Sequence, residues 1–170
     1  MHIKVYANNI LEFQARHFRC ALGRSGVSED KHEGDGATPI GVFALKRLLV
    51  RTDRIASVSS MLLTQAISPD DGWCDDPAHT QYNRLVKLPF DASHEQLWRD
   101  DAVYDLVIEI SHNDDPPVPG AGSAVFIHVA QADYAPTAGC VALARDDLLQ
   151  LLPHWSNDTF IEITDSEYTP

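Results

Sequence analysis

The chain has 170 residues, of which 44% are hydrophobic, and its 25 Asp and Glu side chains against 13 Lys and Arg give a net charge of −12. This length suits one globular domain over residues 1–170, and no apolar run approaches the roughly 18 residues that a membrane span needs. Because so negative a field repels nucleic acids, the composition excludes DNA and RNA as partners.

The charge is unevenly distributed along the chain. Residues 1–64 carry nine Lys and Arg against six Asp and Glu, whereas residues 65–170 carry four against nineteen. Both parts contain strand-like apolar runs, so we expect them to share one core. We interpret the two charge patterns as two faces of one solvated surface.

The first fifty residues have the pattern of strands and turns. Polar and apolar residues alternate in residues 3–7, and Phe13 and residues 17–22 indicate one or two further strands. The glycines and the proline of residues 34–41 predict turns. An apolar pattern that fits either an extended segment or a short helix resumes in residues 42–50.

The middle of the chain lacks a clear strand pattern. Residues 68–88 are rich in Asp, Pro and Asn, which predicts a long irregular excursion over the surface. Ser93 and Gln96 have the spacing of a helix capping box, so we predict a short helix through Trp98.

The last third contains the clearest elements. Residues 105–110 and 123–129 are rich in Val, Ile and Phe and predict strands, separated by a Pro-rich loop at 114–120. The leucines of residues 148–152 fit one face of a helix, and residues 159–164 alternate as a closing strand. We therefore predict a mainly β fold with short accessory helices.

The three cysteines are the first candidates for chemistry. Cys20, Cys74 and Cys140 lie 54 and 66 residues apart, which excludes CxxC redox motifs and paired-knuckle zinc sites. No metal or cofactor is predicted. The odd number leaves one thiol over if the other two pair, and such a thiol is a candidate nucleophile.

A histidine precedes the last cysteine by twelve residues. Phe126 and His128 share one face of the predicted strand, and a loop then returns the chain to Gly139 and Cys140, so the imidazole and the thiol can meet. A neighbouring imidazole lowers the pKa of a thiol, and the glycine lets backbone amides turn toward an oxyanion. On spacing alone, a buried cysteine and a hydrogen-bonded histidine remain the alternative.

Two ordered motifs resemble a known family. Ser123–Leu143, with His128 before Thr137-Ala138-Gly139-Cys140-Val141, resembles the active-site signature of the L,D-transpeptidases of the YkuD (ErfK/YbiS) family. Lys31–Phe43, which contains Thr38-Pro39-Ile40-Gly41, is similar to a second element of that family. With residues 72–77 and 82–84, the likeness runs from about Cys20 to Leu152.

The resemblance implies a β-sandwich catalytic domain that acts on the stem peptides of peptidoglycan in the periplasm. Cys140 would be the nucleophile, His128 its general base, and the carbonyl of Val129 the group that orients the imidazole. The backbone amides of Gly139 and Cys140 would bind the oxyanion. A donor stem would form a thioester on Cys140, and an acceptor amine would resolve it.

The chain also departs from the pattern of the family. Many members have His or Arg where this chain has Ala138 and Arg where it has Ala142, and they often have Gly or Ser in place of Val129. Arg145 is the nearest arginine and the candidate to substitute for the missing ones. These departures leave the cross-link open between L-Ala–diaminopimelate (1–3) and diaminopimelate–diaminopimelate (3–3).

Several other residues are candidates for substrate binding. Lys31 belongs to a basic cluster with Arg24 and Arg19 that could meet stem carboxylates. The full set of predicted substrate-binding residues is Thr137, Ala138, Lys31, Tyr82, Asn83, Arg84 and Asn113.

Three points stay open at the level of sequence. Cys20 and Cys74 form a disulfide in one hypothesis and stay separate thiols in the other. A hydrolase, either an L,D-carboxypeptidase or an endopeptidase, and a catalytically silent peptidoglycan-binding module are the alternatives to a transpeptidase. The opening residues lack the pattern of a signal peptide, and we expect a monomer.

Overall fold

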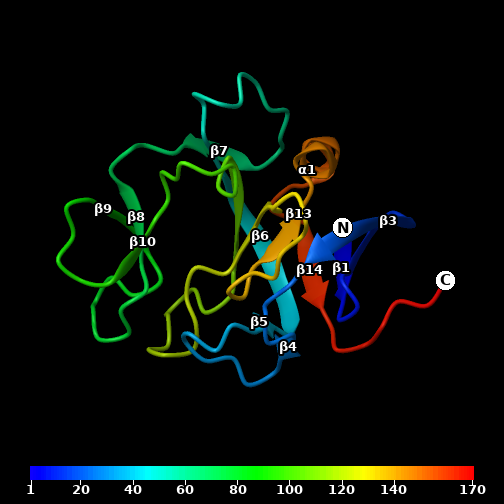
Figure 1. Cartoon of the computed structure of the whole chain (residues 1–170), viewed down its shortest axis with the longest axis horizontal. Coiled ribbons are helices and arrows are strands. Elements are labelled where there is room, and N and C mark those ends of the chain that lie inside the picture. The colour runs from blue at the N-terminus through cyan, green and yellow to red at the C-terminus, as the bar shows by residue number, and fades with distance from the viewer.

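The computed structural model describes all residues 1–170 and consists mainly of strands (Figure 1). The first strands are β1 (His2–Tyr6), β2 (Ile10–Phe13), β3 (Arg16–Ala21), β4 (Val27–Ser28), β5 (Thr38–Pro39), β6 (Gly41–Val50) and β7 (Leu63–Ala66). They are followed by β8 (Asp71–Cys74), β9 (Leu85–Lys87), β10 (His94–Gln96), β11 (Leu106–Ile110), β12 (Phe126–Val129), β13 (Val141–Leu143) and β14 (Phe160–Ile163). The helices are α1 (Arg145–Leu151) and the 3₁₀ turn η1 (Leu152–His154).

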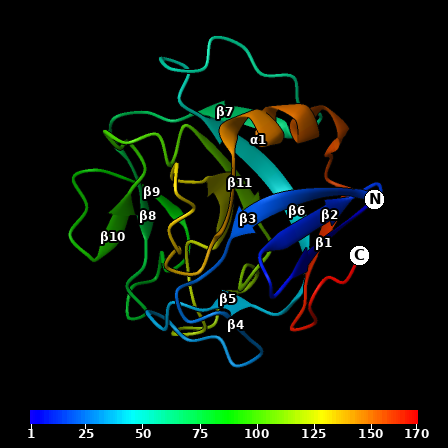
Figure 2. The ribbon, with the colours of Figure 1, turned by 45° about the vertical axis from the view of Figure 1, so that its right-hand side comes forward.

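The largest sheet closes on itself around one core. Its strand order is β11-β12-β13-β3-β2-β1-β14-β6-β7, and β11 also pairs with β6. The additional pairing joins β11, at one end of this order, to β6, the neighbour of the last strand β7, so the strands surround a core of 26 buried residues, as in a sandwich whose layers are connected at both edges. The helix α1 lies across one end of the sheet, with Leu148 and Leu151 buried in the core (Figure 2). The predicted mainly β class is confirmed.

A second, three-stranded sheet with the order β10-β8-β9 covers the outer face of β11 and β12. Trp73 of β8 meets the ring of Phe126 edge-on, with the ring centroids 4.9 Å apart. Leu97 and Val107 belong to the same buried cluster. This packing fixes the small sheet opposite the strands that carry His128 and Cys140.

The structure corrects two predicted elements near this small sheet. The segment with the capping-box spacing is not a helix, because residues 94–96 form β10 and pair with β8, with Glu95 opposite Trp73. The segment 68–88 is not wholly irregular, since it contains β8 and β9. These strands are only three or four residues long, so their pairing partners define them more than their own pattern does.

The thiols of Cys20 and Cys74 do not form a disulfide. Cys20 lies in β3, where its strand pairs with β2 and β13 and its side chain is part of the large core. Cys74 lies in β8, between β9 and β10 of the small sheet. The hypothesis that the two cysteines pair is therefore wrong.

Neither of the two helices has the length and the apolar character that crossing a membrane requires.

Candidate active site

The parallel pairing of β12 with β13 brings His128 and Cys140 to the same face of the large sheet. His128 is in register with Ala142, and Cys140 stands two residues before Ala142, immediately before β13 begins. Since side chains alternate along a strand, His128 and Cys140 point away from the core, whereas Ile127 and Val141 point into it. Alternation and register therefore place an imidazole and a thiol in one pocket.

The turn before Cys140 is held by two threonines. The Thr137 hydroxyl accepts a hydrogen bond from the Gly139 amide at 3.1 Å and donates one to the Cys140 carbonyl at 2.7 Å. The buried Thr38 hydroxyl also reaches that carbonyl, at 3.5 Å. Gly139 has a φ of 141°, and a Cβ at this position would lie 2.8 Å from the carbonyl oxygen of Ala37. Only glycine fits this turn without displacing backbone.

The Cys140 thiol is buried and hydrogen-bonded to backbone. Its Sγ donates to the Ala124 carbonyl at 3.2 Å and accepts from the Phe126 amide at 3.3 Å. Burial raises the pKa of Cys140 to about 12, and the negative charge of Glu95 acts in the same direction. The Phe126 amide and Lys31 lower it by less. The thiol is therefore protonated at neutral pH.

His128 is a neutral base in this environment. Its Nδ1 lies 2.9 Å from the Val129 carbonyl, which can only accept, so Nδ1 carries the proton and Nε2 has the free lone pair. Burial lowers the pKa of His128 to about 4, although the bond to Val129 opposes that shift. The ring of Tyr104 contacts the imidazole edge-on, with centroids 5.4 Å apart. A neutral imidazole faces the pocket throughout the neutral pH range.

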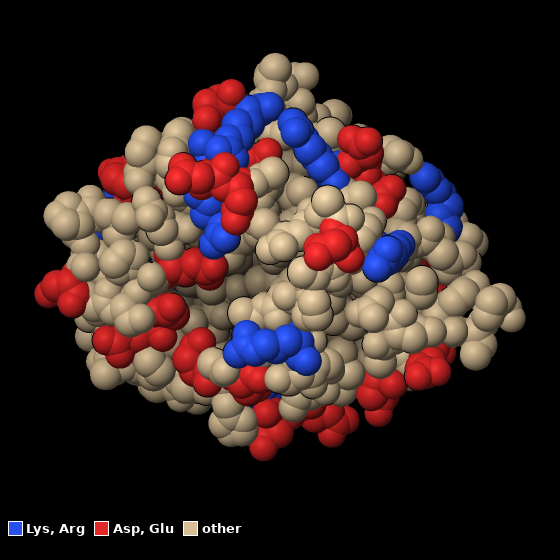
Figure 3. All heavy atoms as spheres, in the orientation of Figure 1, with Lys and Arg blue, Asp and Glu red and all other residues tan.

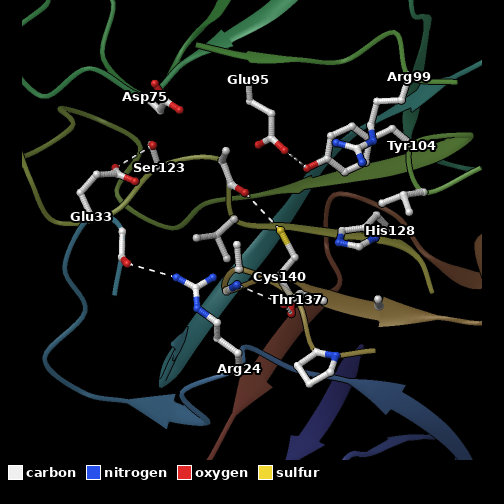
Figure 4. Close-up of a pocket in the computed structure, with 18 of the residues that line it drawn as sticks. Arg24, Glu33, Asp75, Glu95, Arg99, Tyr104, Ser123, His128, Thr137 and Cys140 are labelled. Atoms are coloured by element: carbon white, nitrogen blue, oxygen red, sulfur yellow. Dashed lines mark hydrogen bonds between the residues drawn. The ribbon is translucent and has the colours of Figure 1, made fainter. Parts of the chain in front are cut away.

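The pocket that contains both groups has a volume of about 540 Å³. On the molecular surface it opens as a hollow whose rim carries both basic and acidic side chains (Figure 3). The small sheet contributes Glu95, the large sheet His128, and the loop before β13 contributes Thr137, Ala138 and Gly139. Figure 4 shows Asp75 and Glu95 on one side of Cys140 and Arg24 on the other.

Three of the predicted substrate-binding residues line this pocket. Thr137 and Ala138 do so next to the thiol. Lys31 also lines it, but its Nζ forms an ion pair with Asp35 and donates to the His32 carbonyl at 2.8 Å. Its side chain is only 7% exposed, so its charge is largely satisfied within the protein.

The other four predicted substrate-binding residues lie outside this pocket. Tyr82 is buried and donates its hydroxyl to Glu33. Arg84 binds Asp114 on a different surface. The Asn113 side chain forms hydrogen bonds with the backbone of Val118 and Gly122 and so stabilises the loop in which it lies. These contacts support the fold around the pocket, and none of the four residues lines it.

Among these four residues, Asn83 makes the most side-chain hydrogen bonds inside the protein, through both its oxygen and its nitrogen. Its Oδ1 accepts hydrogen bonds from Trp73 Nε1 at 2.9 Å and from the Ala124 amide at 3.1 Å. Its Nδ2 donates to the carbonyls of His112 and Asn113, at 3.2 and 2.7 Å. The side chain therefore holds the small sheet and the loop before β12 together, directly behind the Ala124 carbonyl that bonds the thiol.

The Asn83→Ala variant is expected to lose about 3 kcal/mol of unfolding free energy. One buried group, Trp73 Nε1, and three partly buried backbone groups would lose their partner, and the φ of 55° at this position also disfavours alanine. Urea unfolding measures the loss, with Asn8→Ala, an exposed asparagine, as the control. Unchanged stability together with lost activity would instead indicate that Asn83 contacts substrate.

The pH dependence of alkylation tests the state of the Cys140 thiol. Because its pKa is raised to about 12, the thiolate fraction should grow tenfold with each pH unit across the neutral range. We expect iodoacetamide to label Cys140 at a rate that rises with this slope from about pH 6 to pH 10, measured by peptide mass spectrometry. A rate that levels off near pH 7 would reveal a thiolate–imidazolium pair instead.

The sequence analysis did not identify the part of the pocket wall that Glu95, Arg99 and Tyr104 form. Glu95 lies in the segment that was predicted to be a helix, and no local motif marks it. Of the three positions that depart from the family pattern, Ala138 and Ala142 line the pocket and Val129 does not. Arg145 does not replace the missing arginines, because it lies at the start of α1 and donates to the Arg54 carbonyl at 3.3 Å.

No group of three or more His, Cys, Asp or Glu side chains is arranged to hold a metal ion.

Comparisons with known proteins give one family match. The sequence model of the YkuD family, described as the L,D-transpeptidase catalytic domain, matches residues 2–163. A comparison with curated proteins found no match.

Two solved structures are similar to the chain at low identity. One is a mutant form of the helical cell shape determining protein Pgp2 from Campylobacter jejuni, with 14% identity, a TM-score of 0.41, and coverage of 98% of this chain and 47% of that chain. The other is Mycobacterium tuberculosis L,D-transpeptidase 1, with 14% identity, a TM-score of 0.39, and coverage of 96% and 60%. The chain thus spans less than two thirds of the length of either protein.

Proposed function

The chain belongs to the YkuD family of L,D-transpeptidase catalytic domains, and we propose that it joins stem peptides of peptidoglycan through a thioester on Cys140. The observation that carries this proposal is the convergence of a thiol and a neutral imidazole in one cavity, at the end of two parallel strands. The site of action is then the periplasm, where this substrate lies, and no cofactor takes part.

The first half-reaction forms the thioester. The proton of Cys140 Sγ passes to Nε2 of His128 while the sulfur attacks the carbonyl carbon of the donor stem. His128 then gives this proton to the leaving amine, which is D-alanine when the donor is a tetrapeptide cut at its last bond. Because both groups start neutral, no ion pair has to exist before the substrate binds. The carbonyl of Val129 keeps Nε2 available by holding the proton on Nδ1.

The oxyanion of the tetrahedral intermediate needs donors beside the sulfur. Gly139 and Cys140 supply the backbone amides, and only the Gly139 amide is engaged within the protein, by Thr137 at 3.1 Å. The Cys140 amide has no such partner, which supports it as the principal donor. Thr137 acts by holding the turn in shape.

The second half-reaction returns the enzyme to its starting state. The amine of an acceptor stem, after loss of one proton to His128, attacks the thioester carbonyl. The new amide forms, the C–S bond breaks, and the departing sulfur takes the second proton from the attacking nitrogen. The proton held by His128 then passes to solvent. In the 3–3 and in the 1–3 linkage alike, the acceptor is an amine.

Purified protein incubated with disaccharide-tetrapeptide tests the proposal. Cross-linked dimers, detected by mass spectrometry, support transfer, and fragmentation of the dimers distinguishes the 1–3 from the 3–3 linkage. Tripeptide without dimers would mean an L,D-carboxypeptidase, in which water resolves the thioester. Unchanged substrate with Cys140 reduced would contradict both activities and leave a peptidoglycan-binding module.

A further inference from the structure

Only some of the charged side chains that line the pocket form ion pairs. Among its cations, Lys31 forms an ion pair with Asp35 and Arg99 with Asp101, whereas Arg24 forms no ion pair and lies on the other side of Cys140 from Asp75 and Glu95 (Figure 4). Its carboxylates, Glu33, Asp75 and Glu95, form no ion pair. On the side of Asp75 and Glu95, the pocket therefore presents negative charge beside Cys140 that no ion pair neutralises.

Glu95 is the carboxylate that a neighbouring side chain holds in place and that still has free hydrogen-bond acceptor positions. It lies on β10, opposite Trp73, and its Oε1 accepts a hydrogen bond from the Tyr104 hydroxyl at 2.6 Å. The ring of Tyr104 in turn contacts His128 edge-on. Figure 4 shows the carboxylate of Glu95 directed into the pocket on the side of Cys140. A carboxylate offers about four acceptor positions, and a protein group fills one of them.

The negative charge of Glu95 is unfavourable in the free protein. Burial raises the pKa of Glu95, and the bond from Tyr104 and the charge of Arg99 oppose that effect by favouring the ionised form. The same charge raises the pKa of the Cys140 thiol. A cation bound beside Glu95 would relieve both effects, because it would balance the carboxylate and make the sulfur a better leaving group.

The other two carboxylates fit this role less well. Glu33 Oε2 already accepts hydrogen bonds from the hydroxyls of Tyr82 and Ser123, the latter at 2.7 Å. Asp75 has a buried Oδ1 without a partner, but no side chain holds its carboxylate in the way that Tyr104 holds Glu95. It lies beside Glu95 in Figure 4 and adds to the local negative potential.

We infer that Glu95 is the acceptor-binding residue of this pocket: its carboxylate, anchored by Tyr104, binds the ammonium group of the acceptor stem beside the Cys140 thioester. This inference rests on the proposed function and names the chemistry that the second half-reaction selects. Glu95 forms no covalent bond. It holds the ammonium until His128 removes one proton, and the resulting amine then attacks the thioester.

The Glu95→Gln variant separates the two half-reactions. Loss of a charge-assisted hydrogen bond should raise the KM for the acceptor roughly 10- to 100-fold, while thioester formation on Cys140 is not slowed, because the lost charge acts on that thiol only by raising its pKa. Products should shift from cross-linked dimer toward hydrolysed tripeptide, measured by mass spectrometry with disaccharide-tetrapeptide. Glu29→Gln removes the same charge from an exposed position outside the pocket and should leave both steps as in the wild type.

A second variant tests the same contact in case Glu95→Gln fails to fold. Tyr104→Phe keeps the ring against His128 and removes only the hydroxyl that anchors Glu95. It should raise the acceptor KM by a smaller factor, again without an effect on thioester formation. An acceptor KM equal to that of the wild type in both variants would overturn the inference, and so would an equal loss of both half-reactions in Glu95→Gln.

A binding measurement makes the inference independent of turnover. In a Cys140→Ala background, calorimetry compares a tripeptide stem whose two amines, at L-Ala and on the diaminopimelate side chain, are free with the same stem acetylated at both amines. Glu95→Gln should weaken binding of the first stem about 10-fold or more and leave that of the second unchanged. Equal binding of both stems to the protein that retains Glu95 would refute the assignment even if the wild type proves inactive.

Discussion

The Cys140→Ala variant is expected to form no thioester and no cross-linked dimer, with a loss of at least about 10³-fold in turnover of disaccharide-tetrapeptide. The reason is that no other nucleophile takes its place at the turn, where the thiol is held by the Ala124 carbonyl and the Phe126 amide. Intact-protein mass spectrometry of the wild type should show the acyl adduct, and the variant should show none.

Cys140→Ser is a sharper form of the same test. A hydroxyl has almost the volume of the thiol and can keep both backbone contacts, so the fold is preserved while the nucleophile becomes much weaker. Cys74→Ala is the matched control, because Cys74 is a buried thiol that does not line the pocket. Cross-linking by Cys140→Ala at the wild-type rate would reject the proposed chemistry.

The His128→Gln variant should lose about 10²- to 10⁴-fold in the rate of thioester formation. Glutamine can still donate to the Val129 carbonyl, but it cannot accept the proton of a thiol whose pKa is raised to about 12. Single-turnover mass spectrometry measures this step apart from product release. The control is His154→Gln, an exposed histidine outside the pocket.

The pH profile adds a readout that a purely structural role of His128 would not change. Burial lowers the pKa of His128 to about 4, so the base is neutral above that pH and becomes protonated below it. Thioester formation in the wild type should therefore be level through the neutral range and fall as the pH drops through about 4. A wild-type decline centred near pH 6.5, the ordinary value for histidine, would contradict a buried neutral base.

Local pattern was enough to predict much of the fold. The strands now seen as β1, β3, β11, β12 and β14 follow from alternation or from runs of branched apolar residues. The small sheet could not be predicted in the same way. Its strands β8, β9 and β10 contain three or four residues each and exist because they pair with one another and pack on Phe126 through Trp73.

The sequence by itself determined the proposed reacting groups, because strand alternation and a glycine turn are local and put His128 and Cys140 on one face. Only the tertiary structure decided what surrounds them. Lys31 is neutralised by Asp35. The buried side chain of Asn83 links the small sheet to the loop before β12 through hydrogen bonds. Glu95 faces the thiol and forms no ion pair. Electrostatic pairing and burial depend on segments that meet only after folding, so no local pattern reveals them.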